Sequence, residues 1–554
     1  MTKWKFIKES IKENPGLAGL AVISGFCYNI FTVLVPIAIG RFYEFNFGFS
    51  SVRLKLFFSG FPFINTDSFH AFLIFFIGII LIRFLFEYTN RYAIGILGER
   101  FSQSLREQLF AHQLRVYIPI YDEKGIGRYL LRYSGDLKSV QNYLTQGIFR
   151  FAQDIFLIAI LLAVIGYYSI IMALIILTFI VCAFGFIFFM NLVLYRISVE
   201  RRNRRSGMLS FVNNSLRSIL SIKVFNKNVP FEHRYNNRSL KLLDIGVKYQ
   251  HITALINAII PFITYLMVGI TMFYIYRLKN SGVDFDKSSF LILILLIISF
   301  LSIFRRILTV NIVWKLGNIS FEKLIAVFML KTESTSYKRK IKIYNEVIVF
   351  KNVVYNTEIS NNESPFNLKI EPHSISFIKS SAGSGKSLTF IKLLLKIYSP
   401  SEGVIYFGKY AADKLSERAI RKQITVVSGK IPLDGNTVFE AISYSRNPEK
   451  RLQCEKVLNE LQQFVPKSQQ LTLSSKIGEQ SNYLNDSQKQ LLLWCRALLT
   501  NKPTWILHFP FDYINENLKK HLLQTILDWK EKKTIIFIDE GFPEGLKVDK
   551  IYEM

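Results

Sequence analysis

Six long apolar stretches constrain the fold of this chain more than any other feature. Each approaches the ~20 apolar residues that an α-helix needs to cross the hydrocarbon of a bilayer. The stretches are Leu17–Ile39, Phe69–Tyr88, Phe151–Tyr167, Ile170–Tyr195, Ile252–Tyr276 and Phe290–Ile307. The chain is 50% hydrophobic, which is too apolar for an ordinary soluble protein. This part is therefore predicted to be an all-α transmembrane domain of six helices.

The distribution of basic residues predicts how these helices are oriented. The net charge is +28, a balance that suits either nucleic acid or a membrane surface. Lys and Arg cluster in Asn90–Arg150 and Arg196–Gln250, beside the apolar runs, which favours the membrane and argues against a nucleic-acid partner. The positive-inside rule places both loops and both termini in the cytoplasm of a multi-pass protein of the cell (inner, cytoplasmic) membrane. Both loops are expected to be helical extensions of the spans.

Several smaller features complete the membrane part. Gly166–Ser169 is predicted to be a tight hairpin, and the outer loop Arg41–Ser68 is long. Arg83 and Glu87 are expected to form a local ion pair, being four residues apart on one helix. Arg305 and Arg306 either meet an anionic substrate group or lie at the inner interface. The four cysteines show no metal spacing and are predicted to be free thiols.

A second region follows the spans. Residues 1–330 are expected to form the transmembrane domain with its cytoplasmic extensions, 331–345 a linker, and 346–554 a separate domain. In this last region short β-branched runs alternate with helical ones, which predicts an α/β fold.

The strongest local motif is SSAGSGKS at residues 380–387, between a strand-like run and an apolar helix. It resembles a P-loop, although Ser380 replaces the first glycine of that pattern. A Gly/Ser turn without a ligand is the alternative, which the order of strand, loop, Lys-Ser and helix disfavours. Lys386 is expected to reach phosphates and Ser387 to bind Mg²⁺. The predicted phosphate-binding residues are Ser381, Ala382, Gly383, Ser384, Gly385, Lys386, Ser387 and Leu388.

Further segments extend the resemblance to most of the chain. Ile477–Leu499 holds a Gly-Glu pair and ends in RALL, as in ATP-binding cassettes, and Tyr121–Leu144 and Ser215–Asn228 resemble the intracellular loops of ABC exporters, with Gly127 and Asp136 at the expected places. The chain thus resembles an ABC exporter half-transporter of the MsbA-like architecture. This implies a P-loop cassette, ATP and Mg²⁺ as cofactors, and a second half-transporter as partner.

The resemblance also identifies positions where this chain departs from the family. The signature becomes Leu484, Asn485, Asp486, Ser487 and Gln488 instead of LSGGQ. The positions of the Mg²⁺-organising Asp and the catalytic Glu hold His508 and Phe509, and an Asp of the next loop is Asn515. Gly429 stands where the family has Gln, and Asp539-Glu540 where it has a switch His. Tyr355 is a possible substitute for the adenine-stacking aromatic. The resemblance therefore implies a degenerate cassette without a complete catalytic set.

Three functions remain open at this point. The chain is expected to be an ATP-binding half of an exporter that hydrolyses ATP weakly or not at all by itself, with a heterodimer favoured over a homodimer. It is alternatively a non-hydrolysing regulatory, scaffold or immunity protein with the same shape. A third interpretation is a self-sufficient ATPase in which His508 and Glu540 have exchanged roles, their strands both flanking the P-loop strand. A hydrophobic or amphipathic cargo, such as a lipid, peptide or drug, is expected.

Overall fold

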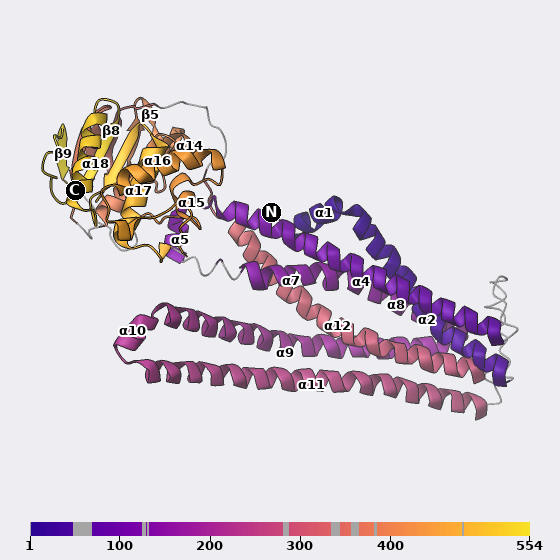
Figure 1. The fold of residues 1–554 in the computed structure, drawn as a ribbon. Helices are drawn as coiled ribbons and strands as arrows, with labels where there is room; N and C mark the ends of the chain where they lie inside the picture. Colours follow the sequence, from indigo (N-terminus) through magenta and orange to yellow (C-terminus); the bar gives the residue numbers. More distant parts are fainter. Residues whose placement is uncertain are drawn as a thin grey trace. The chain divides into compact units, whose positions relative to one another are not determined.

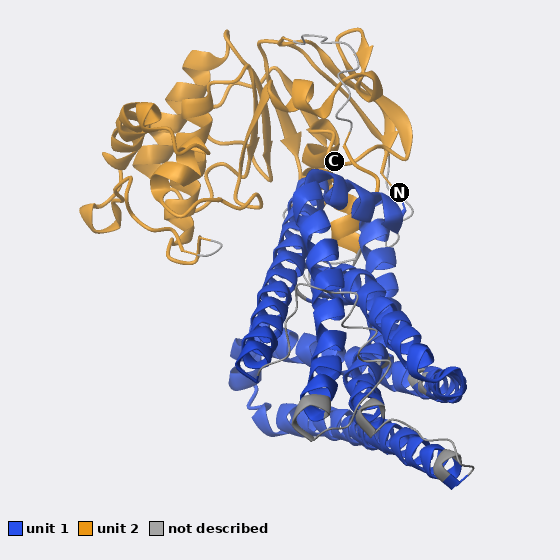
Figure 2. Cartoon of the chain, turned by 90° about the vertical axis from the view of Figure 1, so that its right-hand side faces the viewer, with its two compact units in different colours: residues 1–114, 126–329 blue, residues 115–125, 330–554 orange. Residues whose placement is uncertain are grey.

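The computed structural model describes residues 2–47, 69–124, 129, 132–280, 287–333, 344–355, 365–381, 385–478 and 481–553. The chain divides into two compact units (Figure 2). Unit 1 comprises Met1–Leu114 and Ile126–Met329, and unit 2 comprises Arg115–Gly125 and Leu330–Met554. Unit 1 is helical and unit 2 combines helices with two sheets, which confirms the predicted fold classes.

The described part of unit 1 contains six helices that are long and apolar enough to cross a membrane (Figure 1). Each contains one of the predicted spans, so all six spans are confirmed. The helices are α2 (Pro15–Phe47), α4 (Phe69–Gln113), α8 (Phe151–Tyr168), α9 (Ile170–Arg217), α11 (Asn228–Asn280) and α12 (Lys287–Phe328). A short amphipathic helix, α1 (Lys3–Glu13), precedes them. Most of the predicted outer loop, residues 48–68, lies outside the described residues.

Four of these helices, α4, α9, α11 and α12, run far beyond the thickness of a bilayer. α9 has 48 residues, about 70 Å at the rise of an α-helix, against roughly 30 Å of hydrocarbon. It runs beside α11 and is joined to it through α10 (Ile219–Val224) (Figure 1). This confirms the helical extension predicted for the second basic loop. The predicted hairpin between the third and fourth spans is confirmed as a tight turn, because only Ser169 separates α8 from α9. Ser169 Oγ accepts a hydrogen bond from Met172 N.

The first basic loop is also helical but more broken. It continues α4 and then forms α5 (Ile118–Lys124), η1 (Arg132–Asp136), α7 (Leu137–Asn142) and η2 (Tyr143–Arg150). Asp136 is 1% exposed and binds Arg132, Arg202 and Ser320. These contacts tie the loop to α9 and α12. Gly127, the other residue matched here, lies outside the described residues.

Polar side chains connect the helices inside the apolar part of unit 1. Gln153 of α8 exchanges two hydrogen bonds with Asn90 of α4 and donates to the carbonyl of Ala21. Asn29 of α2 donates to the carbonyl of Gln153. A buried amide without a partner is costly, so this cluster specifies how α2, α4 and α8 pack. The predicted pair of Arg83 and Glu87 is confirmed at 3.9 Å, and Arg83 Nε also donates to Thr32 on α2.

Unit 2 contains an antiparallel sheet of order β2-β1-β4-β5 and a parallel sheet of order β6-β7-β8-β3-β9. The strands are β1 (Ile348–Val354), β2 (Phe366–Ile370), β3 (Ile375–Lys379), β4 (Glu402–Phe407), β5 (Tyr410–Ala411), β6 (Ile424–Ser428), β7 (Thr504–His508), β8 (Thr534–Asp539) and β9 (Lys550–Glu553). β7 is buried throughout, as expected for a central parallel strand covered on both faces.

Helices complete unit 2. They are α13 (Lys386–Leu394), α14 (Glu417–Arg421), α15 (Val438–Ser443), α16 (Arg451–Gln462), α17 (Asp486–Thr500) and α18 (Glu516–Trp529). The prediction that the strands ending at His508 and Asp539 both flank the P-loop strand is wrong for the first. β8 lies between β7 and β3, because β8 pairs with both of them in parallel.

The segment 115–125 belongs to unit 2 although it lies in the first basic loop of the sequence. Val116 forms a bridge with Thr332, and Tyr117 N donates to the carbonyl of Lys331. Most of the predicted linker, residues 334–343, lies outside the described residues.

Candidate functional site

The start of α13 has backbone features that suit a phosphate ligand. Gly385 precedes α13 with a φ of +74°, a conformation that favours glycine, and no side chain of a described residue caps the helix. The N–H groups of the first turn are thus left for a ligand, and a helix N-terminus favours an anion. Lys386 makes no ion pair with any described residue. Ala382, Gly383 and Ser384 lie outside the described residues, whereas Ser381, Gly385, Lys386, Ser387 and Leu388 lie within them.

His508 connects the start of α13 to the parallel sheet. Its Nε2 lies 3.0 Å from Ser387 Oγ, and its Nδ1 lies 2.8 Å from Ser428 Oγ at the end of β6. Parallel pairing places the ends of β6 and β7 side by side, because Ser428 is in register with His508. Burial lowers the pKa of His508 to about 4, and nearby Lys430 adds to the effect. The imidazole is therefore neutral at physiological pH, where the family has a carboxylate.

Phe509 occupies the position expected for the catalytic Glu. Its φ is +47°, an uncommon conformation for a bulky residue. Its N–H donates to the carbonyl of Ile538, and its carbonyl accepts a hydrogen bond from Gln490 Nε2. The ring packs edge-on against His508, with centroids 4.7 Å apart. No group of Phe509 can accept a proton from water or orient it.

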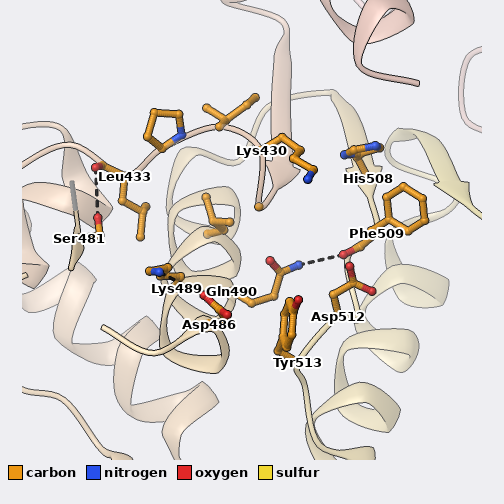
Figure 3. A pocket seen from close by; sticks show the side chains of 14 residues that line it. Lys430, Leu433, Ser481, Asp486, Lys489, Gln490, His508, Phe509, Asp512 and Tyr513 are labelled. Carbon is orange, nitrogen blue, oxygen red and sulfur yellow. Dashed lines mark hydrogen bonds and ion pairs between the residues drawn. The ribbon is translucent and has the colours of Figure 1, made fainter. Parts of the chain in front are cut away.

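A cavity of about 370 Å³ lies beside these residues (Figure 3). Gly429 and Lys430 line it, and so does Gln490 from α17. A Cβ added at Gly429 would lie 3.7 Å from Gln490 Oε1, which is ordinary van der Waals contact, so the backbone here has room for a Cβ. Ser428, Lys430 and Gln490 belong to none of the motifs recognised in the sequence. The end of β6 was a usable signal for the first two, because the ends of neighbouring parallel strands meet, but nothing local marks Gln490.

The residues of the signature position begin α17. Asn485 caps the helix: its Oδ1 accepts from Gln488 N, and Gln488 Oε1 accepts from Asn485 N. Asp486 is the first helical residue and pairs with Lys489 at 3.1 Å. Leu484 is buried, and Ser487 is half-buried. This helix N-terminus therefore carries an amide cap and an acidic side chain instead of glycines. Glu479 lies outside the described residues.

Two more predicted positions have defined surroundings. Asn515 caps α18, its Oδ1 accepting from Leu518 N and its Nδ2 donating to the carbonyl of Phe464. Asp539 ends β8, and its Oδ1 accepts from Glu540 N. Burial raises the pKa of Asp539, and the neighbouring carboxylates of Asp512 and Glu540 add to this. Both ring nitrogens of His508 bind serine hydroxyls, and neither binds Glu540. The exchange of catalytic roles between His508 and Glu540 stays a prediction.

Tyr355 lies in an aromatic contact within unit 2. Its ring stacks on Tyr398 with centroids 4.5 Å apart, and burial raises its pKa to about 12. The Tyr398 hydroxyl donates to Asp122 of α5 at 2.7 Å, and Lys392 of α13 also binds Asp122. The two tyrosines thus connect β1 with both helices. A role for Tyr355 in stacking on adenine stays a prediction.

Arginines and one buried aspartate form a charged cluster in unit 1. Arg306 of α12 binds Asp154 of α8 at 2.6 Å. Arg150 is exposed at the end of η2 and lies within electrostatic range of Arg306, Asp154 and Arg91. Arg305 is exposed. The cluster therefore carries more positive than negative charge.

Comparison with protein families gives two matches. The family described as ABC transporter transmembrane region matches residues 19–309, and the family described as ABC transporter matches residues 364–511. The first match covers more than half of the chain.

Known proteins and structures show the same similarity. The ATP-dependent lipid A-core flippase of Pasteurella multocida is 21% identical over 465 residues, 83% of this chain and 80% of that protein. The protein of the same name from Wigglesworthia glossinidia brevipalpis is 24% identical over 430 residues, 76% and 73% of the two chains. A solved structure of a bacterial Atm1-family ABC exporter with ATP bound superposes with a TM-score of 0.81, over 98% of this chain and 93% of that one, at 15% identity. At that identity the likeness concerns the fold.

Proposed function

The chain belongs to the ABC transporter family, and from this premise we propose that it is the ATP-binding, weakly hydrolysing half of a heterodimeric exporter. It lies in the cytoplasmic membrane with both termini in the cytoplasm. Its cargo is an amphipathic, lipid-like molecule. The contact between His508 and Ser387 carries the proposal, because it combines an intact P-loop helix with a neutral side chain in place of the metal-organising carboxylate.

Nucleotide binding is supported by the start of α13. Gly385 adopts a left-handed conformation, and among the described residues no side chain caps the first turn of the helix. Lys386 stands in that turn without an ion pair to a described residue. These features leave backbone N–H groups and one ammonium group for the phosphates of ATP.

Weak hydrolysis is supported by the residues around the start of α13. Phosphoryl transfer depends on positioning, metal-held charge and an oriented nucleophile. Phe509 orients no water, and Gly429 offers no side chain. The chain is therefore expected to bind ATP much better than it cleaves it.

A second chain is supported by an exposed apolar surface at the tip of the α9–α11 pair. Leu220 and Val224 of α10 are 74% and 68% exposed, and Phe225 is 71% exposed. This tip lies well beyond the bilayer-length part of its helices, so lipid does not cover it. A partner with intact hydrolytic residues is favoured, because two copies of this chain would combine the same losses at both sites.

A lipid-like cargo with an anionic headgroup is supported by the cluster of Arg150 and Arg306. Charged residues at membrane depth usually mark a substrate path or a partner charge. Asp154 neutralises one arginine, and the remaining positive charge suits a phosphate or carboxylate. The names of the flippases in the comparisons agree with this class of cargo.

The central test uses the purified full chain in lipid nanodiscs. We expect saturable binding of radiolabelled ATP that Lys386→Ala abolishes, while Lys392→Ala, on the same helix, retains it. ATP hydrolysis should not exceed that of Lys386→Ala. Absence of ATP binding would overturn the proposal and favour a regulatory or scaffold protein. Robust hydrolysis that Glu540→Gln abolishes would instead indicate a self-sufficient ATPase.

Two further measurements test the partner and the cargo. Affinity purification of the tagged chain from its native membrane should recover a second half-transporter with a Walker B carboxylate; recovery of identical chains alone would contradict the heterodimer. A fluorescent anionic phospholipid should bind the nanodisc-embedded chain more weakly after Arg150→Gln with Arg306→Gln, but not after Arg204→Gln. Equal binding by all three would contradict this cargo site.

A further inference from the structure

The residues around Ser387 do not match the needs of a magnesium ion. Mg²⁺ is a hard cation that prefers oxygen ligands, carboxylates among them. Ser387 contributes one hydroxyl, which is buried and engaged by His508 Nε2. The imidazole offers no oxygen and no negative charge, and Gly429 offers no side-chain oxygen at all. No group of three or more His, Cys, Asp or Glu that could hold a metal ion occurs among the described residues.

Both ring nitrogens of His508 have a hydrogen-bond partner. Ser428 Oγ binds Nδ1 at 2.8 Å, and Ser428 is fully buried. One ring nitrogen donates and the other accepts, so neither is left for a metal, whichever tautomer is present. The hydroxyl chain of Ser428, His508 and Ser387 is therefore a satisfied buried network. This network therefore offers a dication at most the neutral hydroxyl oxygen of Ser387, with no ring nitrogen and no negative charge beside it.

A positive charge is nevertheless present in the cavity that His508 lines. Lys430 follows Gly429, is exposed, and lines the same cavity as His508 (Figure 3). It lies within electrostatic range of His508 and of Asp512, but it makes no ion pair with a described residue. A lysine carries its charge on a flexible four-carbon stem, so the ammonium group can follow a ligand that enters the cavity.

The other charges of the cavity leave Lys430 as its free cation within the described part of the chain. Asp486 and Lys489 also line it, and they neutralise each other at 3.1 Å. Asp512 is the remaining acid, and it would repel a phosphate that approached without a counter-charge. A cation in the same cavity, such as Lys430, offsets this repulsion.

We propose that this cassette binds its nucleotide without a divalent cation, and that the ammonium group of Lys430 supplies the charge that Mg²⁺ supplies in a complete site. The proposal rests on the proposed function, since it concerns the same P-loop. The ligand is a free nucleoside triphosphate held by the uncapped turn of α13, by Lys386 and by Lys430. It also gives a physical reason for a bound but uncleaved nucleotide.

The test compares the affinity of radiolabelled ATP in excess EDTA and in excess MgCl₂, with the full chain in lipid nanodiscs. For the unaltered chain we expect the two dissociation constants to agree within about threefold. His508→Asp, which restores a carboxylate beside Ser387, should make binding at least about tenfold tighter in MgCl₂ than in EDTA. Lys430→Met should weaken binding in EDTA about tenfold, while Lys430→Arg and the exposed control Lys520→Met should preserve it.

Each outcome has a distinct meaning. ATP binding by the unaltered chain that needs MgCl₂ would overturn the proposal and leave the proposed function intact. Binding in EDTA that survives Lys430→Met unchanged would overturn the role of Lys430. No binding under either condition would overturn the proposed function and this proposal with it. Should His508→Asp fail to fold, the comparison on the unaltered chain alone still decides the question of the metal.

Discussion

His508 Nε2 lies 3.0 Å from Ser387 Oγ, which joins the end of β7 to the first turn of α13. β7 and the P-loop strand β3 are not neighbours, because β8 separates them. The contact therefore bridges the width of one strand, and it does so through a neutral ring. The same ring binds Ser428 of β6, so one side chain links three elements.

This link predicts a pH dependence of stability. Burial lowers the pKa of His508 from 6.5 to about 4, so between these values the unfolded chain binds a proton that the folded chain does not. Its contribution to stability is complete above pH 6.5 and is lost as the pH falls toward 4, by on the order of 3 kcal/mol. In the His508→Asn variant, the free energy of unfolding of the nanodisc-embedded chain, measured across this pH range, should lack this pH-dependent contribution. The same substitution at His233, an exposed histidine of α11, should keep it; an unchanged slope in His508→Asn would contradict the assignment.

The hydrogen-bonded cluster around Gln153 predicts that a single methyl group added at Gly25 lowers the stability of the protein. A Cβ at Gly25 would lie 2.0 Å from Gln153 Nε2, which binds Asn90 and the carbonyl of Ala21. Gly25→Ala should therefore break these buried hydrogen bonds and lower stability by about 1–3 kcal/mol. Gly19→Ala on the same helix is the matched control, because its Cβ would meet nothing within 4 Å. Equal melting temperatures of the two variants would show that the cluster does not hold these helices together.

Removal of the buried carboxylate of Asp136 is expected to lower stability more than the substitution at Gly25. Asp136→Asn removes the charge that Arg132 and Arg202 both bind and leaves two arginines without their partner. Breaking a buried ion pair in this way costs about 3 kcal/mol. Glu200→Gln removes the exposed partner of Arg204 and should change stability by less than about 0.5 kcal/mol. Thermal unfolding in the same lipid separates the two, and a similar small effect of both would argue against Asp136 as the anchor of its loop.

The cap of α17 gives a prediction for the signature position. Asn485→Ala removes the oxygen that accepts from Gln488 N and should cost about 1 kcal/mol. Asn485→Ser, which keeps a capping oxygen and restores the residue type of the family, should lose only a few tenths of that amount. Denaturant unfolding followed by tryptophan fluorescence includes this region, because Trp494, one of the five tryptophans of the chain, lies on the same helix. A serine variant as unstable as the alanine variant would exclude capping as the reason for Asn485.

The fold could be predicted from the sequence because its signals are local. A run of apolar residues long enough to cross a bilayer is readable without any tertiary information, as in Ile170–Tyr195. The glycine and lysine of the P-loop are likewise consecutive in the chain. The pair of Arg83 and Glu87 follows from helical spacing alone.

The losses at His508, Phe509 and Asp486 were also determined by the sequence, since each is a residue type at a motif position. What those residues do instead was decided by the tertiary structure. Ser387, Ser428 and His508 come from three separate segments, and only the parallel pairing of β6 with β7 and the packing of α13 bring them within hydrogen-bonding distance. The strand order is a further example, because β8 lies between β7 and β3 through long-range hydrogen bonds that no local pattern encodes. A sequence motif states which groups are present, whereas the partners of a buried polar group depend on which strands pair.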